Sequence, residues 1–231
     1  MQPRIVQIRQ KILKKNDEQA RALRRRFDEA GVFVVSMVSS PGSGKTTLLR
    51  QTLIELIKTQ RVAALVGDLA TDNDAKRLSE SGARVKQIIT GTVCHLEAEM
   101  VENALADWDL GSLDILFIEN VGNLVCPASY DLGEHLRIVL FSTTEGEDKP
   151  LKYPTIFNTA DVAVITKIDL ADAVGFDRTT AHESVLSVRP GMKLMELSSR
   201  SGAGMQEWID FLRERYGTHR PGAPAESRDA H

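Results

Sequence analysis

Apolar positions along the chain follow two alternating patterns. Continuous runs of β-branched and other apolar residues occur at 32–38, 62–66, 86–89, 115–118, 162–165 and 193–197. Such runs are typical of strands buried on both faces of a parallel sheet. Between them, apolar residues recur at helical spacing at 47–58, 74–81, 96–105 and 205–216. The alternation predicts an α/β fold with a mostly parallel central sheet flanked by helices.

Three parts of the chain depart from this alternation. In residues 1–30, apolar residues at helical spacing lie among nine Lys and Arg residues and four Asp and Glu residues. We expect a helical extension there, packed on the main body and broken near Asn16-Asp17, where Asn16 would cap a second helix. Residues 122–159 are rich in Gly, Pro, Ser and Thr and predict a functional loop region. Residues 217–231 lack periodicity and predict a disordered tail.

Composition narrows the class of protein. The 231 residues are 42% hydrophobic and 26% charged, with a net charge of −3, as in globular proteins with a core. The longest uncharged stretch, 30–44, is interrupted by serines and a proline, so we expect no membrane span. The N-terminus has no apolar signal core, which predicts a cytoplasmic protein. The basic segment 1–30 is interpreted as the solvated face of a helix, without a nucleic acid partner.

A phosphate-binding loop follows the first predicted strand. The stretch SSPGSGKT at 39–46 precedes a helix and matches a P-loop, with Ser39 at the position of the usual first glycine. Lys45 would reach the β- and γ-phosphates, and the Thr46 hydroxyl would bind Mg²⁺. The expected nucleotide-binding residues of this loop are Pro41, Gly42, Ser43, Gly44, Lys45, Thr46 and Thr47.

A second motif predicts that the base is guanine. In Thr166-Lys167-Ile168-Asp169, at the end of the strand at 162–165, the Asp169 carboxylate can accept hydrogen bonds from two N–H groups of guanine. Adenine lacks that donor pair. The Lys167 stem would pack along the purine. Ser198, Ser199 and Arg200 follow another strand, where G proteins place a loop that contacts the guanine oxygen. The sequence therefore predicts a GTP site.

The end of the strand at 115–118 carries candidate catalytic residues. Glu119 would hold Mg²⁺ directly or through water, and the Gly122 amide would sense the γ-phosphate. Asn123 stands where Ras-like enzymes have a water-positioning glutamine and is one methylene shorter. We therefore expect slow intrinsic GTP hydrolysis that needs dimerisation or a partner.

Two aspartates follow the strand at 62–66. Asp68 and Asp74 are candidate magnesium or switch residues, although Asp74 could instead cap a helix beginning at Ala75. The expected catalytic set is Lys45, Asp68, Glu119 and Gly122. The expected Mg²⁺ set is Thr46, Asp68, Asp74 and Glu119.

The two cysteines and one histidine form a candidate metal site. Cys94 and His95, expected at a helix start, and Cys126 follow the ends of core strands on the nucleotide side of the sheet. Two thiolates and an imidazole suit Ni²⁺ or Zn²⁺. With three ligands, the site is either open or completed by a second chain. The alternative is a pair of buried, inert cysteines. The remaining histidines, expected at the surface, are His135, His182, His219 and His231.

Together these stretches resemble the HypB family of GTPases, which supply nickel during maturation of [NiFe] hydrogenases. The resemblance spans about residues 7–216 and rests on VSSPGSGKTTLL, GDLATDNDAKR, TGTVCHLEAEM, IENVGNLVCPASYDLGE and TKIDL. It implies a GTPase domain at 31–216 and a GTP-dependent homodimer with metal at the subunit interface. The residues that match the family's metal ligands are Cys94, His95 and Cys126. It also implies a partnership with the nickel chaperone HypA and action on the hydrogenase large subunit.

Three other functions remain open from the sequence. The related urease accessory GTPase UreG has a Cys-Pro-His metal motif, whereas Cys94 and His95 are adjacent here. A GTP-regulated binding module would have inert cysteines and would tolerate Cys126→Ser. A small-molecule kinase on the same fold is disfavoured because Asp169 would serve no acceptor substrate.

Overall fold

One parallel sheet forms the centre of the computed structural model, which describes residues 4–69 and 73–219. In these residues it has seven strands, in the order β3-β2-β4-β1-β5-β6-β7, and every pairing is parallel. The strands are β1 Phe33–Ser39, β2 Val62–Asp68, β3 Arg84–Ile89, β4 Ile115–Glu119, β5 Leu136–Ser142, β6 Val162–Thr166 and β7 Lys193–Glu196. The predicted fold class is confirmed.

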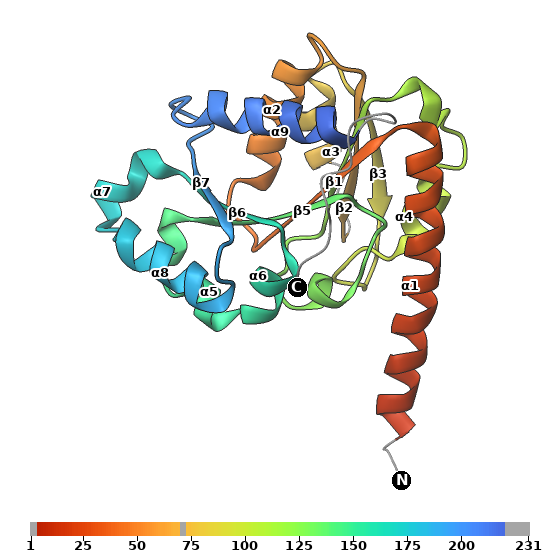
Figure 1. Cartoon of the computed structure of the whole chain (residues 1–231), viewed down its shortest axis with the longest axis horizontal. Helices are drawn as coiled ribbons and strands as arrows, with labels where there is room; N and C mark the ends of the chain where they lie inside the picture. Colours follow the sequence, from red (N-terminus) through yellow and green to blue (C-terminus); the bar gives the residue numbers. More distant parts are fainter. Residues whose placement is uncertain (1–3, 70–72, 220–231) are drawn as a thin grey trace.

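Helices cover both faces of the sheet (Figure 1). They are α1 Arg4–Ala30, α2 Lys45–Leu56, α3 Asn73–Ser79, α4 Ala98–Ala104, α5 Lys149–Lys152, α6 Pro154–Thr159, α7 Ala171–Val174, α8 Arg178–Val188 and α9 Met205–His219. Short 3₁₀ turns lie at Leu110–Ser112, Cys126–Ser129, Thr143–Glu145 and Ile168–Leu170. No helix in the described ranges is long and apolar enough to cross a membrane.

Successive side chains of β1 point to opposite faces of the sheet, so this strand contributes to the core on both faces. Phe33, Val35 and Met37 pack with apolar residues of α2 and α9 on one face. Val34 packs on the other face with residues of α1 and α4, and Val38 with residues of α6 and α8. This is the period-two side-chain pattern of a strand covered on both sides.

The region expected to be a loop, 122–159, contains a central strand, and that prediction was wrong. β5 lies between β1 and β6, and its residues from Ile138 to Phe141 are fully buried. Its apolar run resembles those of the predicted strands, but flanking turn residues concealed it. α8 was also missed, because its buried side is short and partly polar: Ala181, Ser184 and Val185.

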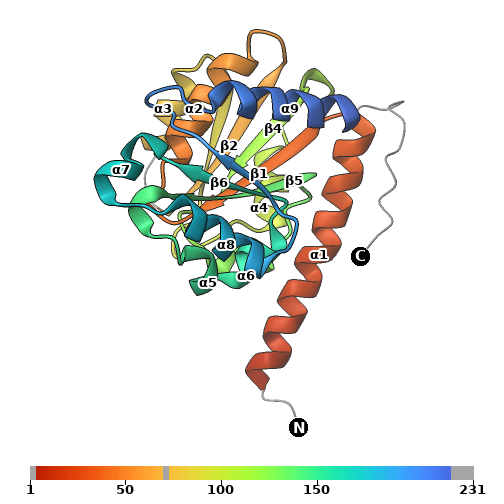
Figure 2. The same cartoon turned by 60° about the vertical axis from the view of Figure 1, so that its left-hand side comes forward.

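The N-terminal segment is a single helix, so the expected break near Asn16-Asp17 was wrong. α1 runs without interruption from Arg4 to Ala30, and its first turns extend beyond the body of the molecule (Figures 1 and 2). Its buried stripe consists of Asn16, Ala20, Leu23 and Phe27. At the other end, α9 continues to His219, past Gly217, where the disordered tail was expected. The remainder of that expected tail, 220–231, lies outside the described residues.

Candidate functional site

A cleft of about 500 Å³ lies at the carboxyl ends of β1, β2 and β4. This edge is where open α/β sheets bind ligands. All of the predicted phosphate-loop, catalytic and magnesium residues line it. The lining residues are Ser39, Ser40, Pro41, Gly42, Ser43, Gly44, Lys45, Thr46, Thr47, Gly67, Asp68, Leu69, Asp74, Arg77, Glu119, Val121, Gly122 and Lys167.

The loop at 39–46 has the backbone geometry that phosphate wrapping needs. Gly42 and Gly44 have positive φ angles of 77° and 92°, which favour glycine. The loop is braced by the predicted guanine-binding motif at 166–169. The Thr166 hydroxyl donates to the Ser43 carbonyl oxygen at 2.5 Å, and the Lys167 ammonium donates to the Gly42 carbonyl oxygen at 2.7 Å. Thr166 and Lys167 thus hold the loop in place from the end of β6.

Lys45, Thr46 and Glu119 meet at the floor of the cleft. The Thr46 hydroxyl donates to Glu119 Oε1 at 2.6 Å, and Lys45 Nζ lies 3.3 Å from the same oxygen. Glu119 is 1% exposed, and its Oε2 has no hydrogen-bond partner among the described residues. A buried, unpartnered carboxylate oxygen beside a hydroxyl is a donor set that fits Mg²⁺.

The predicted residues Gly122, Asp68 and Asp74 lie at the cleft, together with Arg77, which was not predicted. Gly122 lies so close to the loop that a Cβ there would meet Pro41 backbone atoms at 3.3 Å. Asp68 and Asp74 line the cleft. Asp74 lies in the first turn of α3, which begins one residue earlier, so it does not cap a helix starting at Ala75. Arg77 was missed as a cleft residue, although it lies in the quoted stretch GDLATDNDAKR. Residues 70–72 of that stretch lie outside the described residues.

A second, smaller pocket of about 290 Å³ adjoins the loop where the base was expected. It is lined by Gly44, Thr47, Thr166, Lys167, Asp169, Leu170, Ser198, Ser199 and Arg200. The hydroxyl of Ser198 accepts hydrogen bonds from the N–H groups of Arg200 and Ser201, so this side chain supports the loop itself. Lys167 has a φ angle of 57°, a left-handed conformation that turns the chain at the pocket wall.

The structure brings Cys94, His95 and Cys126 together. One ligand atom from each lies within 4.8 Å of the others. The two cysteines are free thiols. Cys94 and His95 precede α4, which begins at Ala98, so the expected placement at a helix start was wrong by three residues. The backbone at Glu97 is still extended, with φ −114° and ψ 156°.

His95 and Cys94 both have shifted pKa values in this cluster. His95 is 9% exposed, and neither ring nitrogen has a hydrogen-bond partner among the described residues. Burial lowers the pKa of His95, although Glu97, 3.4 Å from Nε2, opposes that shift. The pKa of the Cys94 thiol is raised, first by its hydrogen bond with Cys126 and then by burial. A metal ion entering the site must therefore displace a thiol proton but meets a neutral imidazole.

Asn120 and Asn123 hold the cluster from the end of β4. Asn120 Oδ1 accepts a hydrogen bond from the Leu96 N–H at 3.0 Å. Asn123 Nδ2 donates to the Cys94 carbonyl oxygen at 3.3 Å. Asn123 is not among the residues that line the nucleotide cleft. Its side chain instead bonds to the Cys94 carbonyl oxygen and to the Val125 N–H.

The expectation that all the other histidines are surface residues was wrong for two of them. The side chains of His135 and His219 are 3% and 13% exposed and lie beside Asp28, whereas His182 is 44% exposed. His135 Nδ1 accepts a hydrogen bond from the Val34 N–H at 2.9 Å. The neutral ring must therefore carry its proton on Nε2, 3.1 Å from Asp28 Oδ1. His231 lies outside the described residues.

Known proteins resemble this chain closely. Residues 33–196 match the family model described as "CobW/HypB/UreG, nucleotide-binding domain". The hydrogenase maturation factor HypB of Azotobacter vinelandii is 46% identical over 217 residues, which make up 94% of this chain and 72% of that protein. The crystal structure of HypB from Helicobacter pylori in complex with nickel has a TM-score of 0.84 at 40% identity, covering 92% of this chain and 100% of that one.

A more distant structure shares the fold alone. The signal recognition particle 54 kDa protein of Aeropyrum pernix, in complex with GDP, has a TM-score of 0.54 at 17% identity over 80% of this chain and 49% of that one. The family model also covers UreG, but the close relatives are HypB proteins. The resemblance inferred from the motifs is confirmed. The chain belongs to the CobW/HypB/UreG family of P-loop nucleotide-binding proteins and, within it, to the HypB hydrogenase maturation factors.

Proposed function

We propose that this protein is a GTP-hydrolysing metallochaperone that delivers nickel during the maturation of [NiFe] hydrogenases. The observation that carries the proposal is that Asn120 links Lys45 in the nucleotide cleft to Leu96, which is adjacent in sequence to the cluster Cys94, His95 and Cys126. The nickel complex of the Helicobacter pylori relative supports the choice of metal.

The nucleotide part of the proposal assigns a role to each group in the cleft. Lys45 neutralises charge on the β- and γ-phosphates, and Asp169 accepts hydrogen bonds from guanine. Mg²⁺, when bound, supplies positive charge to the phosphate oxygens, and Thr46 and Glu119 are the residues that would hold it. Asp68 and Asp74 complete the proposed magnesium set. Hydrolysis is slow because Asn123, held by Cys94 and Val125, does not orient a water molecule.

The metal part treats Ni²⁺ as cargo, with Zn²⁺ as the competing ion. Two thiolates and one imidazole bind either ion. Three protein ligands leave one coordination position of the metal ion for an acceptor protein or for a second copy of this chain. An open position favours release of the ion. We propose a homodimer with the metal near its interface. The cytoplasm keeps neighbouring thiols reduced and able to bind metal, so it is the proposed site of action.

Asn120 supports coupling between the two sites. Its backbone carbonyl oxygen accepts a hydrogen bond from Lys45 Nζ at 2.7 Å, and its side chain holds the Leu96 N–H beside His95. When Lys45 turns toward a bound phosphate, its bond to Asn120 changes. The geometry at His95 responds, and the metal affinity changes with the nucleotide. The proposed partners in transfer are the chaperone HypA and the hydrogenase large subunit.

A metal titration tests the function. Ni²⁺ and Zn²⁺ are titrated into the protein with Mg²⁺ and a non-hydrolysable GTP analogue, and native mass spectrometry follows the metal and the oligomer together. Cys126→Ser removes one ligand, and Ser129→Ala, in the same 3₁₀ turn, is the matched control. We expect tight binding by the protein and the control, with a marked loss in Cys126→Ser. Equal binding by Cys126→Ser would leave a GTPase with inert cysteines.

A further inference from the structure

Asn16 occupies an unusual position in α1. It continues the apolar stripe formed by Ala20, Leu23 and Phe27, and it is 3% exposed. Asparagine in a helix interior is unfavourable compared with leucine, and burying its amide is costly unless the amide is hydrogen-bonded. The position therefore calls for an apolar residue, and the presence of an amide requires a separate reason.

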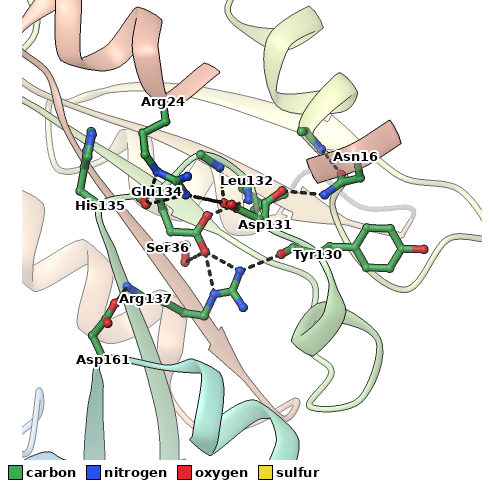
Figure 3. Close-up of polar contacts among 12 residues, drawn as sticks. Asn16, Arg24, Ser36, Tyr130, Asp131, Leu132, Glu134, His135, Arg137 and Asp161 are labelled. Carbon is green, nitrogen blue, oxygen red and sulfur yellow. Dashed lines mark hydrogen bonds and ion pairs between the residues drawn. The ribbon is translucent and has the colours of Figure 1, made fainter. Parts of the chain in front are cut away.

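The Asn16 amide joins two segments that are far apart in sequence. Its Nδ2 donates to the carbonyl oxygen of Asp131 at 2.8 Å, and its Oδ1 accepts from the N–H of Ala98 at 2.9 Å. Ala98 lies three residues after His95, and Asp131 lies five residues after Cys126. Figure 3 shows the side chain of Asn16 directed at the backbone beside Tyr130. One buried amide thus spans the two chain segments that carry the metal ligands.

Three asparagine side chains together hold the backbone between Cys94 and Ala98. Asn123 binds the Cys94 carbonyl oxygen, Asn120 binds the Leu96 N–H and Asn16 binds the Ala98 N–H. The first two belong to the segment that leads from β4 to Cys126. Asn16 alone of the three comes from the N-terminal helix.

Asp131, whose carbonyl oxygen accepts the bond from Asn16, is also bound to α1 through its carboxylate. Arg24 donates to both carboxylate oxygens of Asp131, at 2.7 and 2.9 Å, and more weakly to the Glu134 carbonyl oxygen (Figure 3). Burial acts to raise the pKa of Asp131, but the bonds from Arg24 and the Gly133 N–H outweigh it and hold the pKa below its usual value. The neighbouring Tyr130 ring lies 3.9 Å from the His95 ring, centroid to centroid.

We propose that Asn16 is a positioning residue for the metal site, which sets the spacing between the Cys94–His95 segment and the Cys126 segment from the N-terminal helix. This inference rests on the proposed metal function. The hydrogen bonds of Asn16 go to Ala98 and Asp131 and not to the proposed ligands themselves. It acts through the backbone on either side of the ligands, as outer-shell hydrogen bonds do in other metal sites.

The test measures Ni²⁺ affinity by competition with a chromophoric chelator, together with the thiolate-to-nickel absorption band. Asn16→Leu removes both hydrogen bonds while keeping the helix and its apolar stripe. We expect its Kd for Ni²⁺ to rise about 10-fold and the band to change, since outer-shell partners typically contribute 10- to 100-fold. Asn16→Asp keeps an acceptor for Ala98 but places a buried carboxylate against the Asp131 carbonyl oxygen, so its Kd is expected to rise by at least about 10-fold.

Leu23→Ala is the matched control on the same stripe, because it loosens α1 without touching either hydrogen bond. It should lower the melting temperature and leave the Kd and the band unchanged. Wild-type affinity and an unchanged band in Asn16→Leu would overturn the inference, and so would an equal loss in Leu23→Ala. If the unaltered protein binds no Ni²⁺, or if Cys126→Ser binds it equally well, the proposed function fails and this inference fails with it.

Discussion

Two clusters in the described part of the chain each bring three potential metal ligands within 4.8 Å of one another. They are Cys94, His95 and Cys126, beside the nucleotide cleft, and Asp28, His135 and His219, where α1 and α9 meet the start of β5. They differ in whether the ring nitrogens of their histidines are already hydrogen-bonded. Both ring nitrogens of His95 lack a hydrogen-bond partner among the described residues, whereas both nitrogens of His135 are hydrogen-bonded. Distance alone therefore does not distinguish a metal site from a structural cluster.

The second cluster is explained by packing. The His135 ring stacks on Phe33 at 5.9 Å, and its Nδ1 takes the place of a carbonyl acceptor for the Val34 N–H at the end of the sheet. For Nε2 to bind a metal, the ring would have to lose its remaining proton or give up the bond to Val34. In the first cluster His95 has a ring nitrogen that can bind a metal without such an exchange, and the proton to be displaced is that of the Cys94 thiol.

The largest expected effect concerns the nucleotide cleft, which contacts the first cluster through Asn120. Lys45→Ala should lower GTP turnover on the order of 100- to 1,000-fold, the usual cost of removing one preorganised donor to a reacting oxygen. It should also abolish any dependence of Ni²⁺ affinity on nucleotide. Turnover is measured by phosphate release. A variant that retained nucleotide-dependent metal binding would contradict the route through Asn120.

A matched pair of histidine variants tests the comparison directly. His95→Ala should weaken Ni²⁺ binding by at least about 100-fold, because even outer-shell partners cost 10- to 100-fold. His135→Asn should change the Ni²⁺ affinity by less than about twofold, because distant sites that share no partner are coupled only weakly. Isothermal titration measures both. Comparable losses in the two variants would show that the second cluster also binds metal.

The pH dependence of stability should identify the second cluster as structural. Burial lowers the pKa of His135 to about 4, with further lowering from His219 and opposition from Asp28. Since the native state binds fewer protons than the unfolded chain, this contribution is complete above pH 6.5 and is lost as the pH falls toward 4. We expect a loss of about 2 kcal/mol in the free energy of unfolding between pH 7 and pH 4.5.

Urea unfolding at the two pH values measures this loss. His135→Asn preserves an acceptor for the Val34 N–H and cannot take up a proton, so its stability should vary less with pH than that of the unaltered protein. The same pH dependence in both proteins would rule out His135 as its source.

The smallest expected effect separates the two roles available to Asn123. Asn123→Ala removes the hydrogen bond to the Cys94 carbonyl oxygen, and the Kd for Ni²⁺ should rise by about 3-fold, in line with one neutral hydrogen bond. GTP turnover without metal should stay the same within error. A large fall in GTP turnover with unchanged Ni²⁺ affinity would indicate that Asn123 orients the attacking water molecule instead.

Most of the nucleotide cleft could be predicted from sequence because its residues lie in short runs at the ends of buried strands. The loop at 39–46 and Glu119 are of this kind, and the parallel topology brings them together. The cluster of Cys94, His95 and Cys126 followed from the same placement. These features depend on short sequence motifs and on the rule that open α/β sheets bind ligands at the carboxyl ends of their strands.

Other features depend on contacts between distant segments, which no local pattern carries. Asn16 resembled a helix cap, because asparagine favours caps and the segment gives no sign that Ala98 and Asp131 approach it. His135 resembled a surface residue because β5, which begins at the next position, was interpreted as loop. In both cases the polar side chain is explained by a backbone group on another element.

The most direct test of the account is the Ni²⁺ affinity of the unaltered protein in two nucleotide states. The dissociation constant is measured with Mg²⁺ and either GDP or a non-hydrolysable GTP analogue. The account predicts different constants in the two states, with the difference lost in Lys45→Ala. Equal constants in both states would contradict nucleotide-controlled metal delivery.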